Sequence, residues 1–191
     1  CWDVGHQAYV HKMITGRRDK LNTIRQAGGL SGFPSPFESV HDQFIVGHAC
    51  TAISQGLGLA TARDLQGGKE KVVVVVGDGA LTGGLAYEAL NNAGHLAKRM
   101  LIVLNDNAMS ISKNVGAISK YLNKVITNPL YNRIRAHVEK QLSRFPRLRR
   151  LADYSFESFK HLLVPGLIFE ELGFRYFGPV NGHDVIELVK T

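Results

Sequence analysis

The sequence predicts an α/β fold with a mostly parallel sheet flanked by helices, and two apolar runs separated by a helical stretch are the main reason. Residues 71–76 (KVVVVV) are rich in β-branched side chains and end at Gly77, which is typical of a strand buried on both faces of a parallel sheet. Residues 100–104 form a second such run. Residues 85–97 between them are rich in alanine and leucine and have the length of a crossover helix. The three segments predict one strand–helix–strand unit.

Length and composition exclude several classes of protein. The chain has 191 residues, of which 45% are hydrophobic and 20% charged, so it is able to bury a sizeable core and is not a disordered tail. No apolar run approaches 18 residues, so we expect no membrane span. Two cysteines are too few for a disulfide framework, which favours a reducing, cytoplasmic setting. The chain begins at Cys1 rather than methionine, and we expect it to be a piece of a longer protein, incomplete at both ends.

Upstream of the strand–helix–strand unit, we expect one helix and one loop. Residues 49–65 have helical composition but contain Gly56 and Gly58, each of which costs about 1 kcal/mol relative to alanine inside a helix. A neighbouring backbone passing close to both glycines would explain them. Residues 28–38 are dominated by glycine, proline and serine, which predicts a loop.

Downstream, the pattern predicts further short elements. Residues 128–142 carry apolar side chains every fourth position after an Asn-Pro start, which is typical of an amphipathic helix. A second helical stretch runs toward Leu163. Residues 167–172 predict a short helix, residues 174–177 a strand, and residues 181–182 a turn.

The positive charge of the chain is concentrated in one segment. Residues 113–150 hold ten lysines and arginines and one acid, Glu139, which accounts for the overall net charge of +7. We expect these side chains to form a solvated helical face. No aromatic platform accompanies them, so we do not expect nucleic acid as a partner.

Two polar residues follow the predicted parallel strands. Asp78 comes directly after the first strand and Asn107 shortly after the second, 29 residues later. Because parallel strands end at the same edge of a sheet, these side chains should lie close together. Carboxylate and amide oxygens are ligands that Mg²⁺ prefers, and Mg²⁺ usually completes its shell with phosphates and water. Gly77 and Gly79 would let the backbone approach such a ligand, so the pattern predicts a Mg²⁺-bridged diphosphate.

Asp78 and Asn107 also have simpler explanations, and two other phosphate-binding motifs compete with this interpretation. Asp78 would serve equally well as a helix cap, and Asn107 would serve as a turn residue. A P-loop requires Gly-Lys-Ser/Thr, where this chain has Thr-Gly-Gly at residues 82–84. The glycines at 77, 79 and 83 also do not match the dinucleotide-binding pattern, and no acid follows at the required distance.

The Gly-Asp-Gly at residues 77–79, followed 26 residues later by Asn-Asp-Asn, resembles the thiamine diphosphate motif of the transketolase superfamily. Within that superfamily the chain is similar to the 1-deoxy-D-xylulose-5-phosphate synthase family. The similar segments cover nearly the whole chain: DVGHQAYVHKMITGR, GGLSGFPSPFES, VGHACTAISQGLGLA, VVGDGALTGGLAYEALNNAG, NDNAMSIS and FEELGFRYFGPVNGHD.

The resemblance implies a set of site residues. It implies metal ligands at Asp78, Asn107 and the main-chain carbonyl of Met109. It implies cofactor contacts at His6, Gly47, His48, Ala49, Gly79, Ala80 and Asn107. His6 and His48 are the implied catalytic residues, although each would also suit a packing or capping role. Ala49 stands where serine is usual in the family. The other histidines, His11 among them, receive no role.

The resemblance also implies an activity. Members of the family condense pyruvate with glyceraldehyde 3-phosphate and release CO₂, using thiamine diphosphate and Mg²⁺, and they work as homodimers. Residues 1–191 would form one diphosphate-binding domain with a mobile helical insertion around residues 113–163. The glutamate that polarises the cofactor would lie on another domain, so the chain alone should be inactive. A transketolase and a noncatalytic phosphate-binding module are the alternatives.

Overall fold

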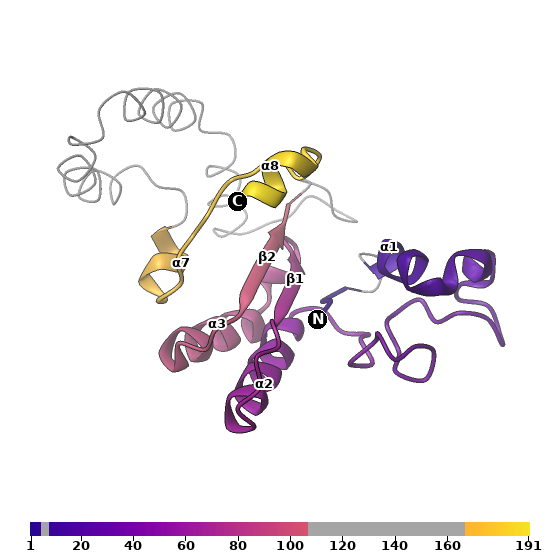
Figure 1. Cartoon of the computed structure of the whole chain (residues 1–191), viewed down its shortest axis with the longest axis horizontal. Coiled ribbons are helices and arrows are strands. Elements are labelled where there is room, and N and C mark those ends of the chain that lie inside the picture. Colours follow the sequence, from indigo (N-terminus) through magenta and orange to yellow (C-terminus); the bar gives the residue numbers. More distant parts are fainter. Residues whose placement is uncertain (5–7, 107–166) are drawn as a thin grey trace. The chain divides into compact units, whose positions relative to one another are not determined.

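The computed structural model of the chain describes residues 1–4, 8–106 and 167–191, which are drawn in colour in Figure 1. The chain divides into two compact units, Cys1–Gly116 and Ala117–Thr191. None of the helices in the described ranges is long and apolar enough to cross a membrane. The α/β fold class is confirmed in the first unit.

The predicted strand–helix–strand unit is present. Strand β1 (Val73–Gly77) pairs in parallel with β2 (Leu101–Asn105), and helix α3 (Gly84–Leu96) connects them. Val73 lies opposite Leu101 and Gly77 opposite Asn105, so both strands end at the same edge of the sheet. The predicted boundaries differ from the observed ones by one or two residues, which is the usual uncertainty at element ends.

A third segment extends this sheet on the other edge of β1. Trp2 forms a parallel bridge to Val75. The Val75 N–H donates to the Cys1 carbonyl at 2.8 Å, and the Asp3 N–H donates to the Val75 carbonyl at 3.0 Å. The main-chain N–H and carbonyl of Val75 both face this N-terminal segment. The main-chain groups of the residues before and after Val75 therefore face β2. The N-terminal segment therefore delivers Asp3 to the carboxyl edge of the sheet.

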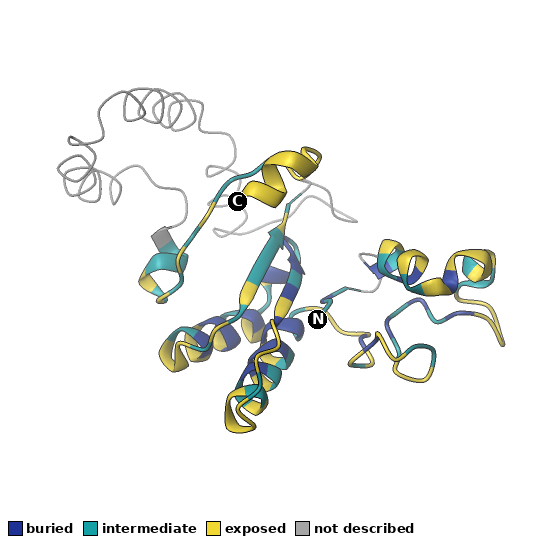
Figure 2. Cartoon of the chain, viewed as in Figure 1, coloured by how far each residue is buried: buried dark blue, intermediate teal, exposed yellow. Residues whose placement is uncertain are grey.

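Helices α2 (Ala52–Leu65) and α3 pack against each other, and α2 also packs against β1. Their buried positions form one stripe per helix, with Ala86, Ala89, Leu90 and Ala93 spaced at helical intervals in α3. Val74 and Val76 of β1 are 0% and 1% exposed, whereas Val73 is 39% exposed. Figure 2 shows the buried residues gathered on α2, α3 and β1. The prediction that β1 is buried on both faces is therefore wrong for the described residues.

Helix α2 starts three residues later than its composition predicts. Cys50 has φ of 74°, in the left-handed region that non-glycine residues rarely occupy. A residue in this conformation cannot lie inside a right-handed helix, so residues 49–51 form a turn that precedes α2. The reason is a tertiary one, because the main chain here is bound by Asp3.

The two glycines of α2 differ in their surroundings. A Cβ on Gly56 would lie 2.3 Å from Cγ2 of Val74, so the close approach expected there is present, although a side chain and not a backbone makes it. Gly58 is exposed and has no atom within 4 Å of the position of a Cβ. The close approach predicted at Gly58 is wrong.

The N-terminal region contains short helical segments followed by the predicted loop. Residues 28–38 form turns and bends, as their glycine and proline content predicts. The short segments are α1 (Tyr9–Lys12), the π-helical η2 (Met13–Arg17) and the 3-10 helix η3 (Arg18–Thr23).

In the second unit, α7 (Leu167–Glu171) is followed two residues later by Gly173, whose φ of 88° confirms the glycine predicted after this helix. The strand predicted at residues 174–177 is wrong, because the segment pairs with no strand among the described residues. Its aromatic rings pack locally instead, with Tyr176 stacked on Phe169 at 5.9 Å between centroids. Asn181 Oδ1 accepts from the His183 N–H, which forms the predicted turn ahead of α8 (Val185–Lys190).

Several predictions lie outside the described residues. They are the helix at residues 128–142, the stretch toward Leu163, the basic segment at residues 113–150 and the insertion around residues 113–163. The single-domain assignment of residues 1–191 also stays a prediction.

We predict that alanine at the two glycines of α2 has opposite effects on stability. Gly56→Ala should lower the free energy of unfolding by about 1–3 kcal/mol, because its Cβ would overpack the stiff, buried Val74 side chain. Gly58→Ala should raise it by up to about 1 kcal/mol, because alanine favours helix and meets no neighbour. Thermal unfolding of both variants tests this, and equal stabilisation by the two would contradict the packing at Gly56.

Candidate functional site

The candidate site lies at the carboxyl edge of the sheet, where β1 and β2 end. Asp78 follows β1 directly and is buried, with 9% of its surface exposed. Its main-chain N–H donates to the Asn105 carbonyl at 3.1 Å, which places it beside the chain that leads to Asn107. Asn107 and Met109 lie outside the described residues, so the metal set of Asp78, Asn107 and Met109 stays a prediction.

A tight turn carries the chain from β1 into α3. The 3-10 helix η4 (Ala80–Thr82) follows Asp78, and the Leu81 N–H donates to the Asp78 carbonyl at 3.2 Å. The hydroxyl of Thr82 donates to the Gly79 carbonyl at 2.7 Å, which holds the turn closed. The N-cap residues of η4 and α3 are Gly79 and Gly83, which have no side chain to cap either helix. The alternative in which Asp78 merely caps a helix stays open.

The predicted cofactor contacts Gly47, His48 and Ala49 lie in the turn before α2, and all three are exposed. The Thr51 hydroxyl donates to the His48 carbonyl at 3.1 Å. His6, the other predicted catalytic residue, lies outside the described residues. We call residues 47–50 the His48 turn and residues 79–83 the diphosphate loop.

The carboxylate of Asp3 holds the end of the His48 turn. It is fully buried and accepts hydrogen bonds from the N–H groups of Cys50 at 2.9 Å and Ala52 at 3.0 Å. A negative charge at a helix N-terminus is favoured both by the free N–H groups and by the helix dipole. Asp3 therefore caps α2 from a distant part of the chain, while the N-cap residue of α3 is Gly83, which has no side chain.

Cys50 joins the His48 turn to the diphosphate loop. A Cβ on Gly83 would lie 2.3 Å from Sγ of Cys50, so only glycine fits opposite the thiol without displacement. The Gly83 N–H itself donates to the Ala80 carbonyl at 3.2 Å. Burial raises the pKa of the Cys50 thiol, the nearby Asp3 carboxylate raises it further, and the Gly83 N–H offsets part of this effect. The thiol is therefore protonated at neutral pH and acts as a packing group.

A buried cluster of charges anchors the loop that leads into the His48 turn. Arg17 donates to both carboxylate oxygens of Asp42, at 2.6 and 2.9 Å, and Lys12 donates to Glu38 at 2.5 Å. The His11 ring nitrogen lies 2.8 Å from Asp42. We call these five residues the anchor cluster. It ties α1 and η2 to residues 31–46, since Asp42 and Glu38 also accept main-chain N–H groups of this loop.

The pKa of Asp42 shows how firmly the cluster binds this carboxylate. Burial by itself would raise the pKa, because it disfavours the charged form. The Arg17 guanidinium, the Ser35 N–H and His11 outweigh burial and hold the pKa of Asp42 well below its ordinary value. Asp42 is thus ionised throughout the neutral range.

Sequence reasoning missed Asp3, Cys50 and the anchor cluster. His11 received no role, yet it contacts Asp42 and packs its ring 5.4 Å from that of Trp2. The partners are separated by 21 to 49 residues, and no periodicity or local motif links positions so far apart. The sequence contains no pattern that would have found these contacts.

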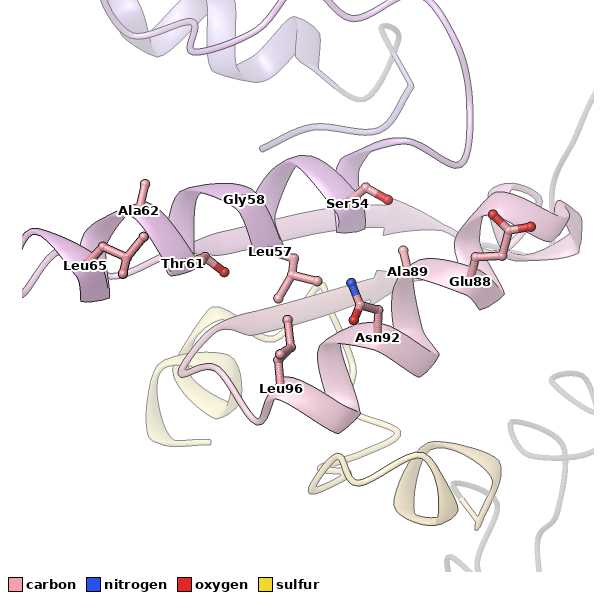
Figure 3. A pocket seen from close by; sticks show the side chains of 10 residues that line it. All are labelled: Ser54, Leu57, Gly58, Thr61, Ala62, Leu65, Glu88, Ala89, Asn92 and Leu96. Carbon is pink, nitrogen blue, oxygen red and sulfur yellow. The ribbon is translucent and has the colours of Figure 1, made fainter.

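Metal-binding side chains and surface grooves are two further features that could mark a site. In the described part of the chain, no group of three or more histidine, cysteine, aspartate or glutamate residues is arranged to hold a metal ion. The predicted metal set contains only one side chain of these types, Asp78. An open groove of about 560 Å³ lies between α2 and α3 (Figure 3). It contains none of the predicted site residues; its lining includes Ser54, Leu57, Gly58, Thr61 and Asn92.

Comparison with known proteins identifies the family. The profile described as 1-deoxy-D-xylulose-5-phosphate synthase matches residues 1–191. The chain belongs to this family. A 1-deoxy-D-xylulose-5-phosphate synthase of Pelotomaculum thermopropionicum is 58% identical over 187 residues, which cover 96% of this chain and 29% of the relative. The synthase of Syntrophomonas wolfei is 58% identical over 98% of this chain and 30% of the relative.

A more distant synthase shows the same coverage. The 1-deoxy-D-xylulose-5-phosphate synthase of Carboxydothermus hydrogenoformans is 52% identical over 100% of this chain and 31% of its own length. The chain therefore spans about 30% of the length of these 1-deoxy-D-xylulose-5-phosphate synthases. The resemblance found in the sequence is confirmed at the level of the family.

We predict that breaking the anchor cluster loosens residues 31–46. Arg17→Met leaves the buried Asp42 carboxylate without its main cation, and uncompensated buried charges cost about 3–5 kcal/mol. Hydrogen exchange of peptides covering residues 31–46 should accelerate by about 100-fold or more. Arg18→Met is the matched control, because Arg18 is exposed. Equal exchange in both variants would contradict the role of the cluster.

The same cluster predicts a pH dependence. The pKa of Asp42 is lower in the folded than in the unfolded chain, so ionised Asp42 stabilises the fold above its ordinary pKa, near 3.9. This stabilisation is lost as the pH falls below about 4. Exchange of residues 31–46, corrected for intrinsic rates, should accelerate between about pH 5 and pH 3. The acid-induced change should be smaller in Asp42→Asn, and an unchanged pH profile would refute the assignment.

Proposed function

We propose that the complete protein condenses pyruvate with glyceraldehyde 3-phosphate, releases CO₂ and forms 1-deoxy-D-xylulose 5-phosphate, a precursor for isoprenoid and thiamine synthesis. The observation that carries this proposal is the match of residues 1–191 to the family. It is supported by the arrangement of Asp78, the diphosphate loop and the His48 turn at one edge of the sheet. The protein would be a transferase of the transketolase type.

The residues of this edge fit a diphosphate bridged by Mg²⁺. Asp78 supplies a buried carboxylate beside the main chain of Asn105, and oxygen donors of this kind suit Mg²⁺. Helix α3 starts at the same edge, its N-cap residue Gly83 has no side chain, and the N-terminal N–H groups of a helix favour an anion. We propose Asp78, Asn107 and the Met109 carbonyl as the metal ligands. Gly79 and Ala80 would contact the diphosphate.

The chemistry supplied by bound thiamine diphosphate is an electron sink for the electron pair left when CO₂ departs. The residues of this chain would position the cofactor and handle protons. We propose that Gly47, His48, Ala49 and His6 line the cofactor. An imidazole ring carries both a proton donor and a proton acceptor, so His48 and His6 are suited to donate or accept a proton at a substrate oxygen. His48 is exposed at its turn, which leaves its ring accessible to substrate.

The rest of the proposed machinery would come from outside this chain. A glutamate that polarises the cofactor would lie on a separate pyrimidine-binding domain, so these 191 residues alone should be inactive. We propose a cytoplasmic homodimer as the working form.

The proposal is tested in the complete reading frame by measuring CO₂ release from pyruvate with Mg²⁺ and thiamine diphosphate, with and without glyceraldehyde 3-phosphate. The wild-type protein should release CO₂ faster when the acceptor is present. Asp78→Ala should lower kcat/KM by about 100-fold or more, because a lost ligand weakens metal binding at least as much as a lost supporting contact. The metal concentration needed for half-maximal activity should rise.

The control is Asp19→Ala, which removes an exposed carboxylate of the short helix η3 and should retain activity. Transfer of two-carbon units between sugar phosphates, without CO₂ release, would make the protein a transketolase instead. If the protein shows neither of these activities, the result would favour a noncatalytic phosphate-binding module.

A further inference from the structure

Two segments proposed to contact the cofactor belong to different parts of the chain, and specific contacts join them. The His48 turn precedes α2, whereas the diphosphate loop follows β1. Residues 47–49 of the His48 turn are exposed, and an exposed turn does not by itself keep a fixed distance from another segment. Their relative position therefore depends on whatever bridges them.

The first bridging contact is the buried carboxylate of Asp3. One oxygen accepts the Cys50 N–H and the other accepts the Ala52 N–H, so the carboxylate uses both oxygens on this turn. Asp3 is itself held by the sheet, because its N–H donates to Val75 of β1. Asp3 thus ties the end of the His48 turn to the strand from which the diphosphate loop emerges.

The second contact is the thiol of Cys50. The left-handed conformation of Cys50, with φ of 74°, directs the sulfur against Gly83 at the end of the diphosphate loop. This conformation is unfavourable for a residue with a Cβ, and the hydrogen bonds that the Cys50 and Ala52 N–H groups donate to Asp3 compensate for it. A Cβ at Gly83 would lie 2.3 Å from this sulfur, so the contact is a steric one.

We propose that Asp3 and Cys50 are positioning residues that set the distance between the His48 turn and the diphosphate loop, and so determine affinity for the diphosphate group of the cofactor. This inference rests on the proposed function. Neither residue touches the cofactor. Asp3 acts through the main chain of the turn, and Cys50 acts through Gly83.

The test uses the protein in its complete reading frame, and the first variant is Asp3→Asn. The amide keeps one acceptor but turns a donor toward one of the two N–H groups, which leaves that buried group unsatisfied. The Kd for thiamine diphosphate should rise by about tenfold or more, while the KM for pyruvate at saturating cofactor changes by less than about twofold. The matched control is Asp19→Asn, which makes the same change on an exposed residue.

Binding of thiamine monophosphate provides a readout that a merely structural role would not change. A destabilised but correctly arranged site would bind the diphosphate and the monophosphate with an unaltered ratio of affinities. A displaced diphosphate loop should reduce the preference for thiamine diphosphate over thiamine monophosphate, because the terminal phosphate of the diphosphate loses its contacts. We expect this reduction in Asp3→Asn, and an unaltered ratio would overturn the proposal.

A pair of substitutions tests the second contact independently of how well Asp3→Asn folds. Gly83→Ala should weaken binding of thiamine diphosphate, because its Cβ would collide with the Cys50 sulfur. Adding Cys50→Gly removes the sulfur and relieves the left-handed conformation, so the double variant should recover part of the lost affinity. Gly58→Ala, which meets no neighbour, is the control. No recovery would contradict the steric contact.

The conservative variant Cys50→Ser keeps a small, unbranched side chain opposite Gly83 and should bind thiamine diphosphate within about threefold of wild type, whereas the branched Cys50→Val should not. The outcomes separate the two proposals. A wild-type protein that neither binds nor requires thiamine diphosphate would overturn the proposed function. If the wild-type enzyme depends on thiamine diphosphate but none of these substitutions changes its affinity for the cofactor, only the positioning role would be overturned.

Discussion

The structure of the first unit depends on the main-chain pairing of β1 with a neighbouring segment on each of its two sides. Val75 bonds to the segment of Cys1 and Asp3, and the alternate positions pair with β2. Because all three segments run parallel, their carboxyl ends meet at one edge of the sheet, which brings Asp3, Asp78 and the chain beyond Asn105 together. The polar residues of the candidate site are collected by backbone geometry, before any side chain contributes.

Two different kinds of interaction then hold the surrounding segments in place. Helices α2 and α3 are held by apolar packing, which includes the close approach of Gly56 to Val74. The loop that leads to His48 leaves several large apolar side chains exposed, Phe37, Val40 and Ile45 among them. The anchor cluster holds this loop through largely buried ion pairs, although Arg17 Nε has no hydrogen-bond partner among the described residues. Buried ion pairs are costly to desolvate but impose a defined geometry through their charge-assisted hydrogen bonds. This arrangement suits a segment that must keep a fixed position beside a charged ligand.

The candidate site was partly predictable from local sequence. Asp78 was expected at the carboxyl edge because a valine-rich run ends there, and the parallel pairing with β2 places it there. The helix before β1 was predicted too long by three residues, since composition does not reveal that Asp3 binds the main chain of Cys50 and holds it outside the helix. The strand expected at residues 174–177 has suitable side chains but no partner strand among the described residues, and a strand exists only when it is paired.

The sequence by itself determined the strand–helix–strand unit, the turns, the edge on which Asp78 lies and membership of a family, because these depend on periodicity and on residues close together in the chain. Only the tertiary structure decided which glycine of α2 is packed, how the anchor cluster pairs and how Asp3 and Cys50 join two turns. These contacts link residues up to 49 positions apart, and a carboxylate has no sequence pattern that names its distant partner. Their pairing is settled by folding, when burial makes every unsatisfied charge and N–H group costly.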